Sequence, residues 1–155
     1  MTLTSTSAFV GASKQYIGWV KTTTRTSIAA SWFSVFDIAG SPGAGTLAGA
    51  STTAGVVPTD ATAGFPTIDA FGGGATGYLA QVDFGSSVAS RLKMFDCVWK
   101  GGAYSFNSNV TLSSQPSYAS RMPGGAYGDT QIWIETVTAF TGNLSVAVTY
   151  TNQDG

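Results

Sequence analysis

The amino-acid sequence predicts an all-β protein, an antiparallel β-sandwich or jelly roll with long Gly/Pro-rich loops and a short N-terminal helix or arm. Three observations lead to this prediction. Several short segments alternate apolar and polar residues with a period of two, which is typical of strands. Gly-rich turns separate these segments, and helical spacing is clear only near the N-terminus. We therefore divide the chain into an arm, residues 1–25, and one β-sandwich domain, residues 26–155.

The arm is predicted to contain a helix over residues 7–21. Apolar side chains recur there at helical spacing, namely Phe9, Ala12, Tyr16 and Val20. Ser5 or Ser7 could cap the helix by accepting a hydrogen bond from a free backbone N–H group. Gly11 and Gly18 weaken it, because a glycine inside a helix costs about 1 kcal/mol relative to alanine.

Six later segments have the alternation of strands. They are residues 28–38, 78–84, 88–99, 103–112, 131–138 and 144–151. Residues 88–99 also fit a helix, because Val88, Leu92, Phe95 and Trp99 could line one face of it. The last two segments flank the Gly/Asn turn 141–143 and predict a hairpin. Its buried face is expected to consist of Ile132, Ile134, Leu144, Val146 and Val148.

Two long irregular stretches interrupt the predicted strands. Residues 40–77 are mostly Gly, Ala, Thr and Ser, contain three prolines and end near a run of three glycines. Residues 113–130 form the second stretch. Loops longer than about 12–15 residues in a compact domain are usually functional or disordered. The apolar residues of the first stretch predict that it packs against something.

The residue types that carry out most enzyme chemistry are nearly absent. The chain has no His, one Cys and one Glu (Glu135), and 10% of its residues are charged. A serine nucleophile would lack a histidine base, and the Gly runs match no phosphate-binding motif and are interpreted as turns. The acidic residues are scattered and form no calcium-binding loop. We therefore predict no enzymatic activity, no catalytic residues, no cofactor and no metal site.

Charge and cysteine content restrict the partners. Seven Lys and Arg residues against eight Asp and Glu give a net charge of −1, and no basic patch for nucleic acid is evident. The chain contains no run of 18 apolar residues, which is about the length needed to cross a membrane as a helix. Cys97 is predicted to be a buried free thiol, because it is the only cysteine and has apolar neighbours. Arg91 and Lys93 are predicted to lie on a solvated strand face; alternatively, Arg91 and Asp96 could pair across a protein interface.

Six strings of the irregular stretches and the C-terminal segment together resemble structural proteins of tailed phages. In chain order they are GSPGAGTLA at 40–48, VPTDATAG at 57–64, AFGGGATGYL at 70–79, QPSY at 115–118, RMPGG at 121–125 and VTYTNQDG at 148–155. The resemblance covers about residues 30–155, and the proteins concerned are similar to capsid cement, or decoration, proteins. The resemblance brings no catalytic residues with it.

This resemblance implies a structural virion protein that binds the outside of a tailed-phage capsid and stabilises the shell. Its expected partners are the major capsid protein and other copies of itself, as a homotrimer. Its expected location is the capsid surface, after synthesis in the cytoplasm of the bacterial host. The residues that we expect to contact partners are Phe9, Tyr16, Trp19, Val57, Phe65, Phe71, Arg91, Tyr118 and Arg121.

Two alternatives from other classes stay open at this point. One is a tail or receptor-binding module that recognises a glycan, which exposed aromatic side chains gathered beside Asp or Asn would favour. The other is a hydrolytic virion enzyme, which two carboxylates a few ångströms apart in an open groove would favour. Nothing in the sequence selects a particular pair among Asp96, Asp129 and Glu135.

Overall fold

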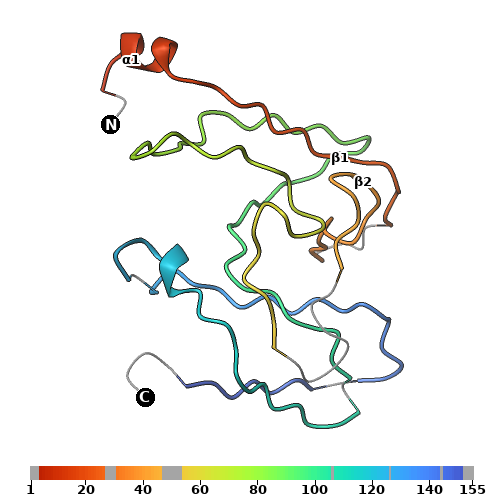
Figure 1. Cartoon of the computed structure of the whole chain (residues 1–155). Coiled ribbons are helices and arrows are strands. Elements are labelled where there is room, and N and C mark those ends of the chain that lie inside the picture. Colours follow the sequence, from red (N-terminus) through yellow and green to blue (C-terminus); the bar gives the residue numbers. More distant parts are fainter. Residues whose placement is uncertain are drawn as a thin grey trace.

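A computed structural model of the chain describes residues 4–26, 31–46, 54–105, 107–125, 127–143 and 145–151. In these residues the helix α1 spans Thr6–Gly11, and the strands β1 and β2 span Val20–Lys21 and Gly40–Ser41. Two short 3₁₀ turns follow, η1 at Ala119–Arg121 and η2 at Pro123–Gly125. Figure 1 shows the arm at one end of the molecule and the C-terminal segment at the other.

The helix α1 begins as the sequence indicated and ends early. Ser5 has an extended backbone, and its hydroxyl oxygen accepts a 3.2 Å hydrogen bond from the N–H of Ala8, which makes it the N-cap. The helix ends at Gly11, so the second half of the predicted span, including Tyr16, lies outside it. A helix this short gains little free energy from propagation, and Gly11 and Gly18 make its extension less favourable.

The strands β1 and β2 form a small antiparallel pair that ties the arm to the following segment. Val20 pairs with Ser41 and Lys21 with Gly40, and the N–H of Thr22 donates to the carbonyl of Ala39 at 3.0 Å. Gly40 has a φ of 150°, and a Cβ at this position would collide with the carbonyl oxygen of Val20. The close approach of the two strands therefore requires glycine here.

The core of the described part is small. Ile38, just before β2, is the buried large apolar side chain there, with 6% of its surface exposed. Beside it, the Lys21 ammonium donates to the carbonyl oxygens of Ile38, Pro42 and Gly43 at 3.0, 2.9 and 3.3 Å. Burial lowers the pKa of Lys21, and the Asp37 carboxylate partly opposes this effect.

A second junction joins the middle of the chain to the long loop. Val56 and Lys100 exchange two backbone hydrogen bonds, of 2.8 and 2.9 Å, as an isolated antiparallel bridge. The Gln115 side-chain oxygen accepts from the N–H of Gly55 at 2.8 Å and from the indole N–H of Trp99 at 3.2 Å. Segments near residues 55, 100 and 115 are thus held at one place.

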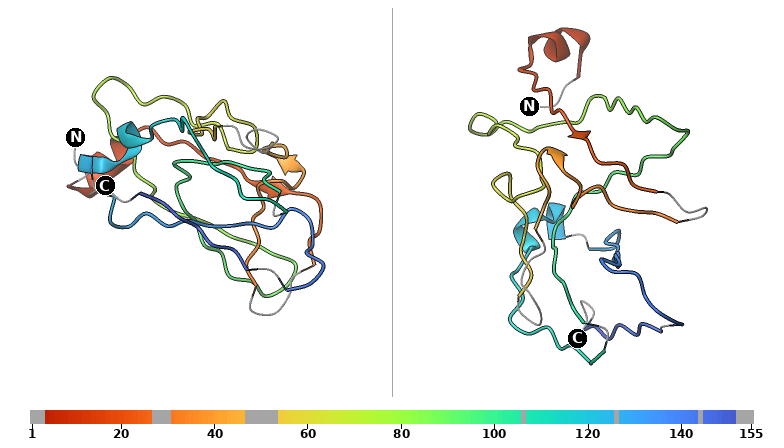
Figure 2. Two further views of the ribbon diagram at one scale, coloured as in Figure 1. Left: turned by 90° about the horizontal axis from the view of Figure 1, so that it is seen from below. Right: turned by 90° about the vertical axis from the view of Figure 1, so that its right-hand side faces the viewer.

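The β-sandwich stays a prediction. Among the described residues, β1 and β2 are the only strands, each two residues long. The predicted hairpin face is exposed at Ile132, Ile134, Val146 and Val148. Some residues of the predicted strands and of the strings that carry the resemblance lie outside the described residues. They are Ile28, Ala30, Leu47, Ala48, Phe106, Leu144 and residues 152–155. In both views of Figure 2 the described chain runs mostly as extended or irregular segments.

Candidate interaction surface

Besides the β1–β2 pair and the Lys21 hydrogen bonds to Pro42 and Gly43, the arm and the long loop also meet through the Gln15 side chain. The Gln15 amide nitrogen donates to the carbonyl of Asp69 at 2.8 Å, and the Gln15 amide oxygen accepts from the N–H of Asp69 at 2.9 Å. This reciprocal pair copies the hydrogen bonding of a β-bridge, with a side-chain amide in place of one backbone peptide. The two regions expected to contact a partner are therefore joined in the structure.

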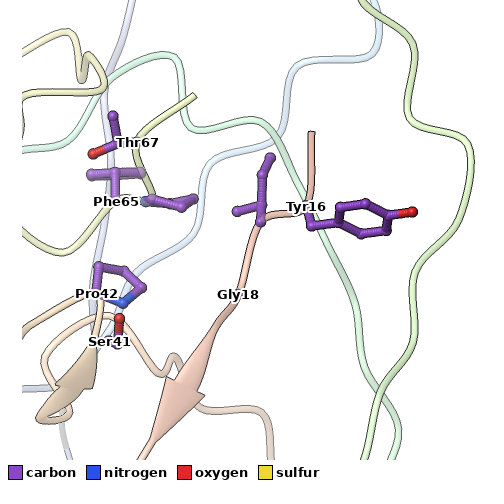
Figure 3. A pocket seen from close by; sticks show the side chains of 8 residues that line it. Tyr16, Gly18, Ser41, Pro42, Phe65 and Thr67 are labelled. Atoms are coloured by element: carbon purple, nitrogen blue, oxygen red, sulfur yellow. The ribbon is translucent and has the colours of Figure 1, made fainter. Parts of the chain in front are cut away.

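An open pocket of about 260 Å³ lies next to this contact. Its lining comes from the arm, the β2 region and the long loop, and consists of Tyr16, Ile17, Gly18, Ser41, Pro42, Phe65, Pro66 and Thr67. In Figure 3 the Tyr16 ring points away from Phe65 and Pro42. We call residues 15–18, 41–42 and 65–69 together the arm–loop surface.

The arm–loop surface combines exposed apolar side chains with polar groups and carries little charge. Tyr16 is 94% exposed, and Ile17 and Ile68 are also exposed. Asp69 is its one charged residue, and the Asp69 backbone is already bonded to Gln15. Such a surface suits contact with another protein, because aromatic and aliphatic side chains supply most of the energy of protein interfaces.

The structure brings only some of the predicted contact residues together. Tyr16 and Phe65 line the same pocket, and the Phe65 ring packs on Phe36 at a centroid distance of 5.2 Å. Phe9 and Trp19 are exposed on the arm, where each ring lies under a lysine ammonium, Lys14 and Lys21 respectively. Phe71 is exposed farther along the loop, and Val57 is partly buried near the Val56–Lys100 bridge.

The last three predicted contact residues lie away from the arm–loop surface. Arg121 is held within the chain, because its guanidinium donates to the Pro58 carbonyl and to the Asp96 carboxylate. The Tyr118 ring packs edge-on against Tyr127 at 6.1 Å. Arg91 is exposed and forms no ion pair with a described residue, and Asp96 is paired with Arg121 within the chain; the pairing of Arg91 with Asp96 across a protein interface stays a prediction.

A cluster of aromatic side chains gathers around Lys93. Its ammonium lies 4.4 Å from the ring centroid of Trp32 and 5.7 Å from that of Trp133, and Phe95 packs on Trp133 at 5.2 Å. Trp32, Phe95 and Trp133 are each about half exposed. Cation–π contacts of this kind contribute about 0.5–1 kcal/mol at exposed sites. The cluster joins three segments that are distant in the sequence.

Cys97 is a free thiol and is half-buried, so it is more accessible than the sequence indicated. Burial is the main cause that raises its pKa, and the Asp96 carboxylate adds to the effect. Lys100, Arg121 and a weak hydrogen bond to the Trp99 carbonyl act in the opposite direction. A thiol whose pKa is raised is a poor nucleophile at neutral pH.

The described residues contain no group of three or more Cys, Asp or Glu side chains placed to hold a metal ion. Within the same part of the chain, no helix has the length and apolar character needed to span a membrane.

Sequence reasoning missed Gln15, Lys100 and Gln115, which make several of the contacts between distant segments. Each of these residues forms hydrogen bonds, through its side chain or its backbone, to a main-chain group or an aromatic side chain far away in the sequence. No local sequence pattern therefore identifies these residues. Comparison of the chain with models of protein families, with curated proteins and with solved structures finds no match.

Proposed function

We propose that this chain is a structural virion protein that binds the outside of a tailed-phage capsid and stabilises the shell. The observation that carries the proposal is the arm–loop surface, in which exposed side chains of the arm and of the long loop, with Asp69 as the one charged residue, are held side by side by the Gln15–Asp69 hydrogen bonds and the β1–β2 pair. The near absence of catalytic side chain types supports a binding role over an enzymatic one. The proposed location is the capsid surface, after synthesis in the host cytoplasm.

Stabilisation would follow from mass action. A protein that binds the assembled shell and not its separated subunits shifts the equilibrium toward the shell by RT ln(1 + [L]/Kd). The arm–loop surface offers two segments of the chain, and these could contact two neighbouring copies of the major capsid protein at once. Exposed Tyr16 and Ile17 would serve as anchors on this surface.

We also propose that the protein acts as a homotrimer. Threefold sites on icosahedral shells favour trimeric ligands, because each copy then meets an equivalent capsid surface. Analytical ultracentrifugation at micromolar concentration should show a species near three times the chain mass of 15.9 kDa. A monomer with a melting temperature independent of concentration would contradict this.

Cosedimentation with undecorated capsids tests the proposed function. Tyr16→Ala should weaken binding to shells by roughly tenfold, since truncating an interface anchor costs about 1–2 kcal/mol or more. Tyr150→Ala is the matched control, because Tyr150 is 72% exposed and lies in the C-terminal segment, at the other end of the molecule from the arm (Figure 1). The proposal is wrong if the unmodified protein does not sediment with shells.

Glycan recognition is the second candidate, favoured by the half-exposed aromatic cluster of Trp32, Phe95 and Trp133. Sugar rings stack on exposed aromatic faces, and Lys93 could donate hydrogen bonds to them. A glycan array is the direct test, with Trp133→Ala as the variant expected to lose binding. Absence of any glycan signal with the unmodified protein would remove this candidate.

A further inference from the structure

The chain exposes far more surface than one folded copy of its mass should. Its accessible surface is 12442 Å². A folded monomer of 15.9 kDa is expected to expose about 7,400 Å². The difference, about 5,000 Å², is as large as the total area buried in an obligate protein–protein interface.

Part of this excess lies in residues 78–96. In Figure 2 this segment runs outward from the body of the molecule, turns back and returns. Its outgoing limb, residues 78–84, and its returning limb, residues 90–96, are exposed and carry both polar and apolar residues; the large apolar side chains on them are Tyr78, Leu79, Val82, Phe84, Leu92, Met94 and Phe95. On the returning limb, the Lys93 and Phe95 side chains also contact Trp32 and Trp133 of the same chain. No backbone–backbone hydrogen bond joins residues 78–96 to another described residue.

Extended limbs with free backbone groups and apolar side chains are templates for strand pairing. The two limbs are complementary in an antiparallel register that places Val82 opposite Leu92. This register also places Asp83 opposite Arg91, and Leu79 opposite Phe95. Asp83 accepts hydrogen bonds only from Gln81 among the described residues, and Arg91 has no ion pair there, so both charges are open to a partner.

We infer that the limb 78–84 of one copy pairs with the limb 90–96 of a second copy of this chain. The occupant is another copy because the two limbs do not hydrogen-bond to each other within one chain, whereas their charges and apolar residues match. Each copy offers one limb of each kind, so the pairing can close into a symmetric ring. This inference goes beyond the proposed function and does not depend on capsid binding.

Cysteine cross-linking of the full-length chain distinguishes pairing between copies from pairing within one copy. In a Cys97→Ser background, Val82→Cys and Leu92→Cys proteins are mixed in equal amounts and oxidised mildly. A disulfide-linked dimer that contains one of each is expected. Val88→Cys replaces Leu92→Cys in the control mixture, where little linked dimer is expected, because residue 88 lies several residues out of register with residue 82.

The protein that carries both Val82→Cys and Leu92→Cys gives the decisive result. Pairing between copies predicts linked oligomers from it, whereas an intrachain disulfide in a monomer would overturn the inference. Charge reversal is the second test and needs no cysteine. Asp83→Arg should weaken self-association by several-fold in sedimentation experiments, and adding Arg91→Asp should restore it; unchanged association of Asp83→Arg would also overturn the inference.

Discussion

The guanidinium of Arg121 lies 2.5 Å from the carboxylate of Asp96. The same guanidinium donates to the carbonyl of Pro58, so one side chain joins the long loop, the segment near residue 96 and η1. The Arg121 side chain is 32% exposed and that of Asp96 is 66% exposed, so solvent screens the ion pair. The hydrogen bond to a partly buried carbonyl is therefore an important part of this contact.

Arg121→Gln should lower the free energy of unfolding by about 0.5–1.5 kcal/mol, because it removes both hydrogen bonds while leaving Asp96 in contact with water. Urea denaturation measures the change. Arg91→Gln is the control, since Arg91 is exposed and has no ion pair in the described part of the chain. Equal stabilities of the two variants would show that Arg121 does not hold these segments together.

Gly40→Ala should be destabilising by about 1–3 kcal/mol, because its φ of 150° is strained for any residue with a Cβ and because the methyl group would collide with Val20. Thermal unfolding followed by circular dichroism measures the loss. Gly43→Ala is the matched control, since a Cβ there meets nothing within 4 Å. If the two variants have the same melting temperature, β1 and β2 do not approach each other as described.

Gln15→Ala should release the part of the arm near residue 15 from the long loop, while the β1–β2 pair still holds residues 20 and 21. Trypsin should then cleave after Lys14 several-fold faster, because the neighbouring backbone is no longer held near Asp69. Gln81→Ala serves as control, since among the described residues the Gln81 side chain bonds only to Asp83, two residues away. The same rate of cleavage in Gln15→Ala and in the unmodified chain would count against the arm–loop contact.

The thiol of Cys97 should react slowly with a disulfide reagent at pH 8. Burial raises its pKa, so at a given pH a smaller fraction is thiolate than in the unfolded chain, and the rate should keep increasing to higher pH. The measurement compares native protein with protein in concentrated urea across a pH series. Identical pH profiles in the two states would refute a raised pKa in the folded chain.

The protein is expected to have no hydrolytic activity. Polysaccharide, peptidoglycan and peptide panels should give no product, because the sequence offers no histidine base and one glutamate. Sustained product release that Asp96→Asn or Glu135→Gln abolishes would contradict this expectation.

Local features of the structure were predictable, and contacts over distance were not. The capping role of Ser5 follows from its hydroxyl and its place before an apolar-periodic segment. The pairing of β1 with β2 and the Gln15–Asp69 contact depend on main-chain groups that every residue has, so no residue type announces them. Alternation predicted strands at 78–84 and 131–138, but it cannot say which chain segment, or which copy, supplies the partner strand.

The residues that the sequence analysis expected to contact a partner fall into two groups in the structure. Aromatic content selected Tyr16 and Phe65, and both line the pocket beside the long loop. Arg121 was also expected to contact a partner, yet the fold uses it internally, because Pro58 and Asp96 come within reach of its guanidinium. A charge in a loop has no sequence signal for whether its counter-ion lies in the same chain or in a partner.

The contact between Gln15 and Asp69 places different requirements on the residue type at the two positions. At residue 69 both hydrogen bonds use the main chain, so many side chains would keep the contact, and proline, which lacks the N–H, would break it. At residue 15 the contact needs a side-chain amide of the right length. Substitutions at position 69 can therefore remove the negative charge of this surface, or replace it by a positive one, while both hydrogen bonds to Gln15 are kept.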